Sequence, residues 1–491
     1  MNSYHNYIGG RWVPAKGGAT FANENPATGE VLGYFPASGA EDVAAAVGAA
    51  AKAVPAWQAT PAPRRAEILF RAAEIMIQRK EEMARDVTLE MGKVLKEGRG
   101  DIQEGIDMTY YMAGEGRRSF GYTTPAELPN KFAMCLRMPH GVVAAITPWN
   151  FPFAIPPWKL MPARVTGNTV VFKPSPYSPK SAWNLVRVLE EAGLPPGVVN
   201  LVLGGDEAGA LLVGDPRVHL VSFTGSVEAG REVASRCVQT GKRVHLEMGG
   251  KNAIIVMDDA DLELAVDGAI WSAFGTSGQR CTAASRLIVH RRVMSEFTQR
   301  LVERAKALRL GDGLDEGVEI GPLVNREQLE KVKGYVRIGL DEGATIACGG
   351  RRANRGELAQ GYFFEPTVFV DVKPQMRIAQ EEIFGPVTDV IPVNDLEEAI
   401  AINNDVPYGL SSAIFTRDVD KAFRAIAGIT TGIVYVNAGT IGAEVHLPFG
   451  GTRGTGNGHR EAGQAALDTY SEWKAVFVDY SGHLQKAQID R

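Results

Sequence analysis

The sequence predicts an α/β protein with two doubly wound α/β domains and a small additional β module. Short apolar runs alternate with amphipathic stretches from His140 to Gly250, and the same alternation returns from Asn252 to about Asn437. The apolar runs are almost unbroken, which is typical of parallel strands buried on both faces of a sheet. Two β-like segments lie outside both regions and fit neither domain.

The first region predicts a parallel sheet with helical connections. We expect strands at 142–147, 169–175, 198–204, 219–225 and 242–249, and helices at 180–192, 208–213 and 228–237. The first of these helices ends at Gly193, and the prolines that follow it are typical stop signals. Connections between the parallel strands should be right-handed.

An Ala-rich helical stretch, roughly 42–118, precedes this region, and a second alternating region follows it. We expect strands there at 252–257, 285–290, 362–372, 387–393, 411–416 and 431–437, and helices at 294–308, 327–341, 396–404 and 419–427. The two β-like segments that fit neither region are 121–138 and 469–480.

Length and charge narrow the class of protein. The 491 residues allow two to four domains at roughly 100–200 residues each. The net charge is −5 and both signs are scattered, so nothing indicates a nucleic acid or a membrane as partner. The N-terminus lacks the layout of a signal peptide, and no apolar stretch approaches the ~20 residues of a membrane helix.

The four cysteines are far apart and form no CxxC pair. This spacing indicates neither a disulfide framework nor a zinc site, and we expect no metal. A reducing compartment fits such sparse cysteines, so the expected location is cytoplasmic.

Cys281 stands out among the four, because it lies in the small and polar sequence GTSGQRCTAAS. Most intracellular cysteines are buried small hydrophobes, and Cys135, Cys237 and Cys348 fit that description. The neighbours of Cys281 offer backbone and side-chain donors instead of packing. A thiolate needs such donors to lower its pKa and to hold an oxyanion, so Cys281 is the candidate nucleophile.

Glu247 ends the apolar stretch KRVHLEMG. A strand-end carboxylate turned into solvent is the ordinary alternative, because an unpaired Glu is rarely buried. However, the pair Gly249-Gly250 allows a ligand or another backbone to approach closely. The carboxyl ends of parallel strands are also where α/β sheets bind ligands.

The nucleotide signals are weak when each is taken alone. The usual GxGxxG fingerprint is missing. FTGS at 223–226 joins a strand to a helix, with Gly230 one turn later, and free N–H groups there could bind a pyrophosphate. An ordinary βα loop is the alternative. Lys173 ends another strand, where a solvated lysine is the alternative.

Together these segments closely resemble the aldehyde dehydrogenase superfamily, from NPATGE at 25–30 to the C-terminal tail. The motifs that carry the resemblance are TPWNFP (147–152), FKPS (172–175), FTGS (223–226), LEMGGKN (246–252), GQRCT (278–282), EEIFGPV (381–387) and PFGG (448–451). Met248 stands where most members have Leu, which is a volume-conserving change.

The resemblance implies roles for individual residues. Cys281 would be the nucleophile, Glu247 the general base, and Asn150 the donor of a side-chain amide to the oxyanion. Lys173 would bind the adenosine ribose and Glu382 the nicotinamide ribose. The implied cofactor-binding residues are Ile146, Thr147, Pro148, Trp149, Lys173, Ser175, Gly225, Ser226, Met248, Glu382 and Phe384.

The family also implies three modules. A Rossmann-like dinucleotide-binding domain would comprise 1–120 and 141–249, and a catalytic domain 250–449. An oligomerisation module would combine 121–140 with 450–491, which accounts for the two unplaced β-like segments. We therefore expect a homodimer or a homotetramer.

The implied reaction is the oxidation of an aldehyde to a carboxylic acid, with NAD or NADP as hydride acceptor. It would pass through a cysteine thiohemiacetal and a thioester that water hydrolyses. One alternative is a CoA-acylating aldehyde dehydrogenase, although such members usually lack the base at Glu247. Another is a non-catalytic binding protein that kept the fold, in which Cys281, Asn150 and Glu247 would have been free to change.

Three positions bear on specificity. Many NAD-preferring members carry Glu where this chain has Pro176, so the choice between NAD and NADP is open. TIGAEVHLPFGG at 440–451 most resembles members that act on acidic semialdehydes, such as α-ketoglutarate or α-aminoadipate semialdehyde dehydrogenases. Arg280 could meet a substrate carboxylate, but a structural arginine turned away from the substrate is the favoured alternative.

Overall fold

Two α/β units and a projecting β arm make up the chain in this computed structural model, which describes residues 2–118, 121–486 and 488–489. The few remaining positions of the predicted modules lie outside the described residues. Four short strands, which no sequence pattern had predicted, come first: β1 Asn6–Ile8, β2 Arg11–Val13, β3 Thr20–Glu24 and β4 Val31–Pro36. The expected helical stretch follows as α1 Ala40–Ala59, α2 Ala62–Gln78, α3 Lys80–Met91 and α4 Leu95–Glu115.

The first sheet contains all five strands predicted for the first region. They are β7 Val142–Ile146, β8 Thr169–Lys173, β9 Val199–Leu201, β10 Leu220–Thr224 and β11 Arg243–Glu247. The strand order is β11-β10-β7-β8-β9-β1-β2. The five predicted strands pair in parallel, but β1 and β2 extend the sheet in antiparallel pairing, which the sequence did not predict.

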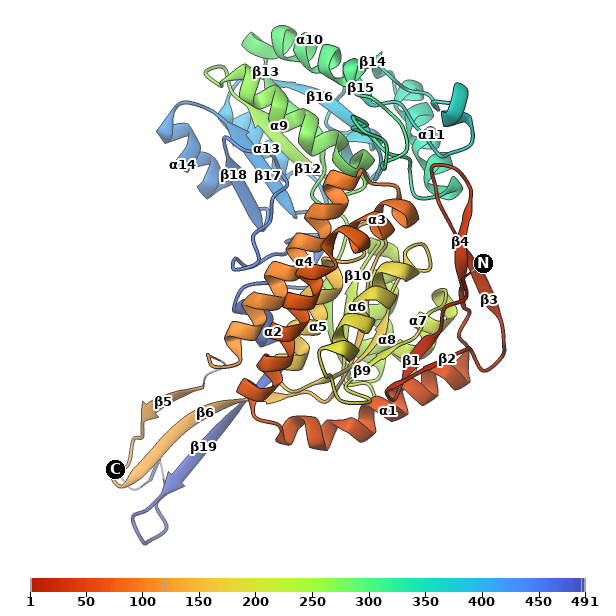
Figure 1. The fold of residues 1–491 in the computed structure, drawn as a ribbon. Coiled ribbons are helices and arrows are strands. Elements are labelled where there is room, and N and C mark those ends of the chain that lie inside the picture. The colour runs from red at the N-terminus through yellow and green to blue at the C-terminus, as the bar shows by residue number, and fades with distance from the viewer. Residues whose placement is uncertain (1, 119–120, 487, 490–491) are drawn as a thin grey trace.

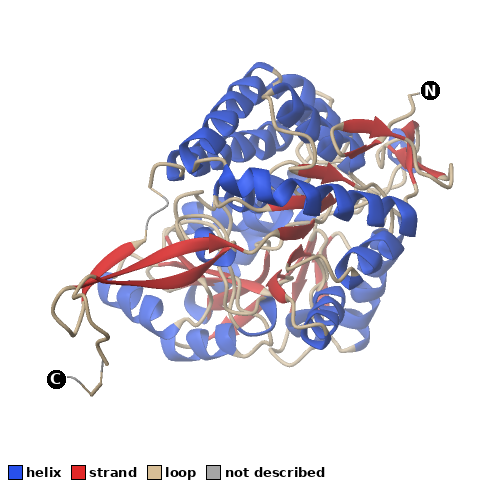
Figure 2. Cartoon of the chain, turned by 90° about the horizontal axis from the view of Figure 1, so that it is seen from below, coloured by secondary structure: helices blue, strands red, loops and turns tan. Residues whose placement is uncertain are grey.

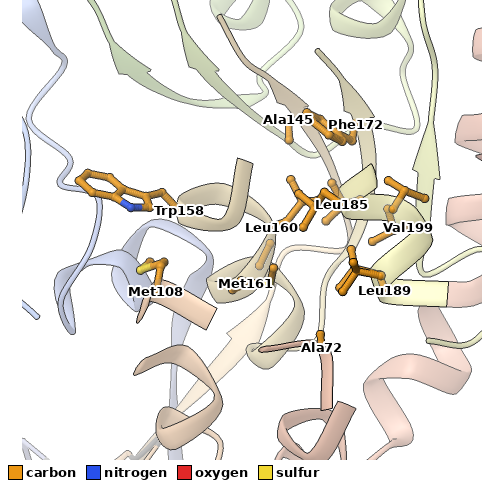
Figure 3. Close-up of a cluster of buried hydrophobic side chains, with 14 of the residues drawn as sticks. Ala72, Met108, Ala145, Trp158, Leu160, Met161, Phe172, Leu185, Leu189 and Val199 are labelled. Atoms are coloured by element: carbon orange, nitrogen blue, oxygen red, sulfur yellow. The ribbon is translucent and has the colours of Figure 1, made fainter. Parts of the chain in front are cut away.

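Helices cover both faces of this sheet (Figure 1). Side chains of β7 alternate between the two faces: Val143 and Ala145 join one core cluster, and Val142 and Ala144 join the other. The helices that connect the strands are α5 Ile155–Val165, α6 Pro179–Glu191, α7 Asp206–Gly214 and α8 Val227–Gln239. In Figure 3 the larger cluster joins Phe172 and Ala145 of the sheet to Leu160 and Trp158 of α5.

The strand order reverses between β7 and β10. From β7 the chain proceeds through β8 and β9 to one side, and it later returns with β10 and β11 on the other side. Such a switch point leaves a crevice at the carboxyl ends of the strands, and ligands bind there in open α/β sheets. Those ends carry Thr224, Ile146, Lys173 and Glu247, which the register places next to one another along the edge.

The second sheet has the order β14-β15-β16-β13-β12-β17-β18. Its strands are β12 Asn252–Val256, β13 Ala284–His290, β14 Thr345–Cys348, β15 Thr367–Val370, β16 Val387–Val393, β17 Ser411–Phe415 and β18 Ile433–Val436. All pair in parallel except β14, an antiparallel edge strand that was not predicted. The strand predicted at 362–372 shortens to β15, because Pro366 cannot donate to a ladder.

The helices of this unit are α9 Leu262–Phe274, α10 Arg291–Ala307, α11 Arg326–Asp341, α12 Arg377–Gln380, α13 Leu396–Asn404 and α14 Val419–Gly428. The structure thus agrees with the predicted α/β class and with the four helices predicted for this region. It adds α9, whose residues are too uniformly apolar to show a helical period.

The third sheet is an arm that projects from the body of the molecule (Figures 1 and 2). It pairs β5 Tyr122–Pro125, β6 Lys131–Pro139 and β19 Ser471–Asp479 in antiparallel order. The segment before β19 does not belong to the arm. It contains α15 Ala465–Thr469, and Phe449, Ala462 and Tyr470 pack into the core against the first sheet.

Among the described residues, no helix combines the length and the apolar character needed to cross a membrane.

Candidate active site

The loop that carries Cys281 follows α9 and begins with a 3-10 turn, η1 Gly275–Gly278. Thr276 and Ser277 adopt left-handed backbone angles, with φ of 52° and 56°, which are rare for residues other than glycine. The Thr276 N–H donates to Glu97 of α4 over 2.8 Å, and the Ser277 hydroxyl donates to the Gly321 carbonyl over 2.7 Å. Tertiary contacts therefore hold a strained loop in front of the cysteine.

Cys281 is half-buried and lines a cavity of about 130 Å³. Burial, with added repulsion from Glu247 and Glu382, raises the pKa of its thiol to about 12. The expectation that the loop donors lower this pKa is not met, because the Thr276 N–H donates to Glu97 and the Gln279 amide to the Pro322 carbonyl instead of the thiol. The Asn252 amide donates to the carbonyls of Cys281 and Ala283 over 2.7 and 2.9 Å.

Asn150 approaches the same loop from the segment between β7 and α5. Its side chain is 3% exposed, and its Nδ2 donates to the Gln279 carbonyl over 3.0 Å. Gln279 is itself fixed, because its Oε1 accepts the Val324 N–H over 2.9 Å. One N–H of the amide thus orients the group, and a primary amide has a second N–H to give to a ligand.

Glu247 is 3% exposed at the end of β11, beside Thr224 at the end of β10. Neither carboxylate oxygen has a hydrogen-bond partner among the described residues. Burial, reinforced by the nearby charge of Glu461, raises its pKa well above the ordinary range for Glu. A buried carboxyl with a raised pKa that lines the same cavity as the thiol has the properties of a general base.

A polar cluster lies behind Glu247. Lys159 of α5 forms a buried ion pair with Glu461, and its Nζ also lies 3.2 Å from the Ser222 hydroxyl. His245 lies 3.6 Å from Glu461 and 3.9 Å from Glu247. The sequence interpretation missed this cluster, because its members come from four separate segments.

The cofactor residues predicted at the first sheet lie along its switch point. Lys173 is 5% exposed, and burial lowers its pKa to about 8. The hydroxyls of Thr147 and Thr224 are buried without partners among the described residues. Orphaned polar groups of this kind, at the carboxyl ends of parallel strands, fit a bound polar ligand.

The FTGS turn leads into α8, whose N-cap is Ser226. The Ser226 hydroxyl accepts the Ala229 N–H over 3.2 Å, which leaves the first N–H groups of the helix for an anion. A Cβ on Gly230 would lie 2.3 Å from the sulfur of Met248, so glycine lets the helix pack over that side chain. The four residues FTGS, for which an ordinary βα loop was the alternative, therefore lead into a close-packed helix start.

Glu382, which belongs to the second α/β unit, reaches the same edge of the first sheet. Its carboxylate accepts the Gly250 N–H over 3.0 Å, and burial raises its pKa. A Cβ on Gly249 would lie 2.0 Å from this carboxylate, so any larger residue there would displace the Glu382 side chain. The ring of Phe384, whose φ is +60°, meets Trp149 edge-on with centroids 5.5 Å apart.

Two of the predicted cofactor residues turn their side chains elsewhere. Ile146 packs into the core cluster on one face of the first sheet, so only its backbone can reach a ligand. The Ser175 hydroxyl accepts the Tyr177 N–H over 3.2 Å. Pro148 lies half-buried between Thr147 and Trp149. Overall, the buried, partner-free groups at this edge fit a dinucleotide better than they fit a closed protein interior.

Arg280 lines the cavity, but its guanidinium is bound by residues outside the cavity. Its guanidinium lies 2.9 Å from the Glu97 carboxylate and 2.9 Å from the Thr276 hydroxyl. It also lies over the rings of Trp271 and Phe151, at 4.7 and 5.4 Å. This geometry is that of an arginine that braces the loop, the alternative favoured from the sequence.

Several cavity residues escaped the sequence interpretation. The aromatic ones are Phe151, Trp158 and Phe449, and Glu104 adds a carboxyl whose pKa burial raises to about 8. Phe449 is bridged to Glu461 by two backbone hydrogen bonds of 2.7 Å. The PFGG motif was a signal for Phe449 and the TPWNFP motif for Phe151, but nothing local marks Trp158 or Glu104 as part of a cavity. No group of three or more potential metal-ligating side chains occurs in the part of the chain that the structure describes.

Comparisons with known proteins agree with this geometry. Residues 12–476 match the model of the aldehyde dehydrogenase family. The chain is 43% identical to alpha-ketoglutaric semialdehyde dehydrogenase of Bacillus subtilis over 97% of this chain and 98% of that protein. It is 40% identical to the NADP-dependent succinate-semialdehyde dehydrogenase of Escherichia coli, over 96% and 97% of the two chains. A crystal structure of betaine aldehyde dehydrogenase from Staphylococcus aureus with NAD+ superimposes with a TM-score of 0.96 at 36% identity, covering 98% and 95%.

Proposed function

This chain belongs to the aldehyde dehydrogenase family, and we propose that Cys281, Asn150 and Glu247 carry out its reaction. The protein oxidises an aldehyde to a carboxylic acid with NAD or NADP. The assignment of these three residues is supported by one observation above all. Glu247 and Cys281 line a single cavity, and both oxygens of the Glu247 carboxylate are free of protein partners among the described residues.

The proposed chemistry begins with the thiolate of Cys281, which attacks the aldehyde carbon. The Asn150 amide and the Cys281 N–H donate to the oxyanion, each donor contributing about 3–4 kcal/mol in comparable enzymes. When bound, the oxidised nicotinamide supplies the hydride acceptor and a positive charge. Collapse of the oxyanion expels a hydride to that acceptor and leaves a thioester on Cys281. Water attacks the thioester, Glu247 takes the water proton as general base, and the Cys281 thiolate leaves as the carboxylic acid is released.

The test separates the two half-reactions in Glu247→Gln. Acylation and hydride transfer need Cys281 and Asn150 but no base for water. We expect a burst of NAD(P)H close to one equivalent per site, followed by a steady state about 10²–10⁴-fold slower than that of the unsubstituted enzyme. Rapid-mixing absorbance at 340 nm measures both phases. An unchanged steady rate, with deacylation limiting in both proteins, would remove Glu247 from the mechanism.

For the cofactor we propose contacts with the residues along the switch point, and with Glu382 and Phe384 from the second unit. The partner-free hydroxyls, the start of α8 and the close approach at Gly249 support this assignment.

We also propose the division into a dinucleotide-binding domain (1–120 and 141–249), a catalytic domain (250–449) and an oligomerisation module (121–140 and 450–491). The two separate sheets and the projecting arm support it, although 449–470 also packs against the first sheet.

The first substrate class that we propose is a carboxylate-bearing semialdehyde, because the two relatives whose sequences are compared above are named semialdehyde dehydrogenases. Arg280 is the basic side chain in the lining of the cavity, and it is already bound to Glu97. An uncharged aldehyde is the second candidate, favoured by the aromatic lining of Phe151, Trp158 and Phe449. Steady-state kinetics with glutaric semialdehyde and with pentanal decide between them. Arg280→Met should raise KM for the semialdehyde alone if the guanidinium binds its carboxylate.

We propose that the arm makes the protein a homodimer or a homotetramer. Large apolar side chains stay exposed on it, among them Tyr122 at 52%, Trp473 at 46% and Phe477 at 67%. Exposed apolar surface on a projecting sheet is typical of an interface. Light scattering of Phe477→Asp against the unsubstituted protein tests this.

A cytoplasmic location is a further proposal, supported by four free cysteines.

A further inference from the structure

His245 occupies a position in β11 from which it can act on the proposed base. It precedes Glu247 by two residues, so both side chains project from the same face of the strand. Its side chain is 0% exposed. Burial, with repulsion from Lys159, His459 and Arg460, lowers its pKa well below the ordinary range, so the imidazole is neutral and carries a single N–H.

The neighbours of His245 determine which nitrogen carries that proton. Nδ1 lies 3.2 Å from the Ser222 hydroxyl, and the same hydroxyl lies 2.9 Å from the Tyr470 hydroxyl and 3.2 Å from Lys159 Nζ. Lys159 can only donate. If Tyr470 also donates to Ser222, then the Ser222 proton goes to Nδ1, and every hydroxyl in the network is satisfied.

The opposite tautomer leaves more groups unsatisfied. With the proton on Nδ1, the imidazole would donate to Ser222, and Ser222 would donate to Tyr470. The proton of the buried Tyr470 hydroxyl would then have no acceptor, and the Nε2 lone pair would also be unpaired. Each unsatisfied buried polar group costs about 1–3 kcal/mol, so the network favours the proton on Nε2.

Nε2 has no hydrogen-bond partner among the described residues, and a carboxylate oxygen, Oε1 of Glu247, lies 3.9 Å from it. That separation is about 1 Å beyond a hydrogen bond, a gap that a rotation of the Glu247 side chain can close. We propose that the Nε2–H of His245 supports the ionised form of Glu247 and so lowers the pKa at which it becomes a base. His245 is thus a positioning residue, and the inference rests on the proposed role of Glu247.

Other charged groups lie near His245, but none of them takes the place of the Nε2–H beside Glu247. The carboxylate of Glu461 lies on the Nδ1 side at 3.6 Å and is already paired with Lys159. The ring of His459 meets that of His245 edge-on at 5.9 Å from the exposed side of the C-terminal segment. Glu247 itself is buried next to Glu461, whose charge opposes its ionisation. Lys159, Arg460 and the Gly451 backbone also favour a negative charge on Glu247, and the uncommitted Nε2–H can add a side-chain hydrogen bond from β11 itself.

Two substitutions of matched shape test the proposal in the full-length enzyme. His245→Asn retains a polar atom near the position of Nδ1 but has none at Nε2, and His245→Gln places an amide N–H near Nε2. We measure the rate of deacylation against pH by rapid mixing, together with the burst amplitude. In His245→Asn we expect the apparent pKa on the acidic side of the pH–rate profile for deacylation to rise by about one unit. Deacylation near pH 7 should therefore be about tenfold slower. The burst should stay near one equivalent, and His245→Gln should restore most of the profile.

The outcomes separate this inference from the proposed function. If Glu247→Gln blocks deacylation but His245→Asn leaves the pH profile unchanged, the role of His245 is wrong and that of Glu247 stands. If Glu247→Gln has no effect, the proposed function itself fails. A loss of burst and steady state together in both His245 variants would mean a purely structural role. Should His245→Asn fold poorly, Ser222→Ala provides the same test, because it removes the donor that keeps the proton on Nε2, and an unshifted profile overturns the proposal.

Discussion

A Cβ atom on Gly450 would lie 2.5 Å from Oε1 of Glu247, so the loop that contains PFGG passes directly against the carboxylate of the proposed base. Gly450 also has a φ of +147°, which residues with side chains rarely adopt. Position 450 therefore requires glycine for two reasons: the backbone conformation of the loop and the space that the Glu247 side chain occupies. The motif that the sequence marks as a family signature shapes the pocket of the base.

Gly450→Ala should therefore affect deacylation more than acylation. The added methyl group displaces the Glu247 side chain, and the strained backbone lowers the free energy of unfolding by about 1–3 kcal/mol. We expect a burst of NAD(P)H near one equivalent and a steady state at least tenfold slower. Gly458→Ala is the control, because it shares a positive φ of 95° but would meet nothing within 4 Å. Equal deacylation rates in the two variants would contradict the role assigned to Gly450.

Cys281 should be the only essential thiol. Cys281→Ala is expected to abolish dehydrogenase activity and to leave NAD(P) binding, measured by calorimetry, within a small factor of the unsubstituted protein. Cys135→Ser, Cys237→Ala and Cys348→Ala should keep kcat within a few-fold, because none of these cysteines lines the cavity. Turnover in Cys281→Ala would overturn the assignment.

The high pKa of Cys281 predicts a steep pH dependence for its reactivity in the cofactor-free enzyme. Only the thiolate reacts with iodoacetamide, and below a pKa of about 12 its fraction rises about tenfold per pH unit. Inactivation by iodoacetamide should therefore accelerate continuously from pH 7 to pH 10. A plateau below pH 8 would show that loop donors stabilise the thiolate after all.

Pro176 predicts that NADP is accepted. Proline carries no charge that could repel a 2′-phosphate. We expect kcat/KM for NADP within about 10³-fold of that for NAD, a difference of about 4 kcal/mol. Pro176→Glu should lower kcat/KM for NADP at least tenfold and change that for NAD little. A stronger preference for NAD in the unsubstituted enzyme would mean that another group discriminates.

Gly249→Ala should weaken cofactor binding specifically. A Cβ there would lie 2.0 Å from the Glu382 carboxylate and would push it away from the switch point. KM for NAD should rise at least tenfold, with a small change in KM for the aldehyde. Gly214→Ala is a matched control for a glycine in the same unit, because it would meet nothing within 4 Å and, like Gly249, has no positive φ. Equal KM values for NAD in both variants would exclude Glu382 from the cofactor site.

Local patterns in the sequence determined the fold class, the five parallel strands of the first sheet and the residues of the motifs. Alternation of apolar runs and amphipathic stretches is a local property, so Val142–Ile146 and Thr169–Lys173 could be recognised as strands from their own residues. The short edge strands, such as Asn6–Ile8, could not, because three residues carry no period and their place in the sheet depends on pairing with the distant strand β9.

Only the tertiary structure decided how the site works. The sequence could name Cys281, but its raised pKa comes from burial among carboxylates that lie far apart along the chain. Likewise, the brace on Arg280 is Glu97, and the cluster behind Glu247 joins Lys159, Ser222, His245 and Glu461. Desolvation and charge interactions depend on distance in space, and that distance is set only when the two sheets and the C-terminal segment pack together.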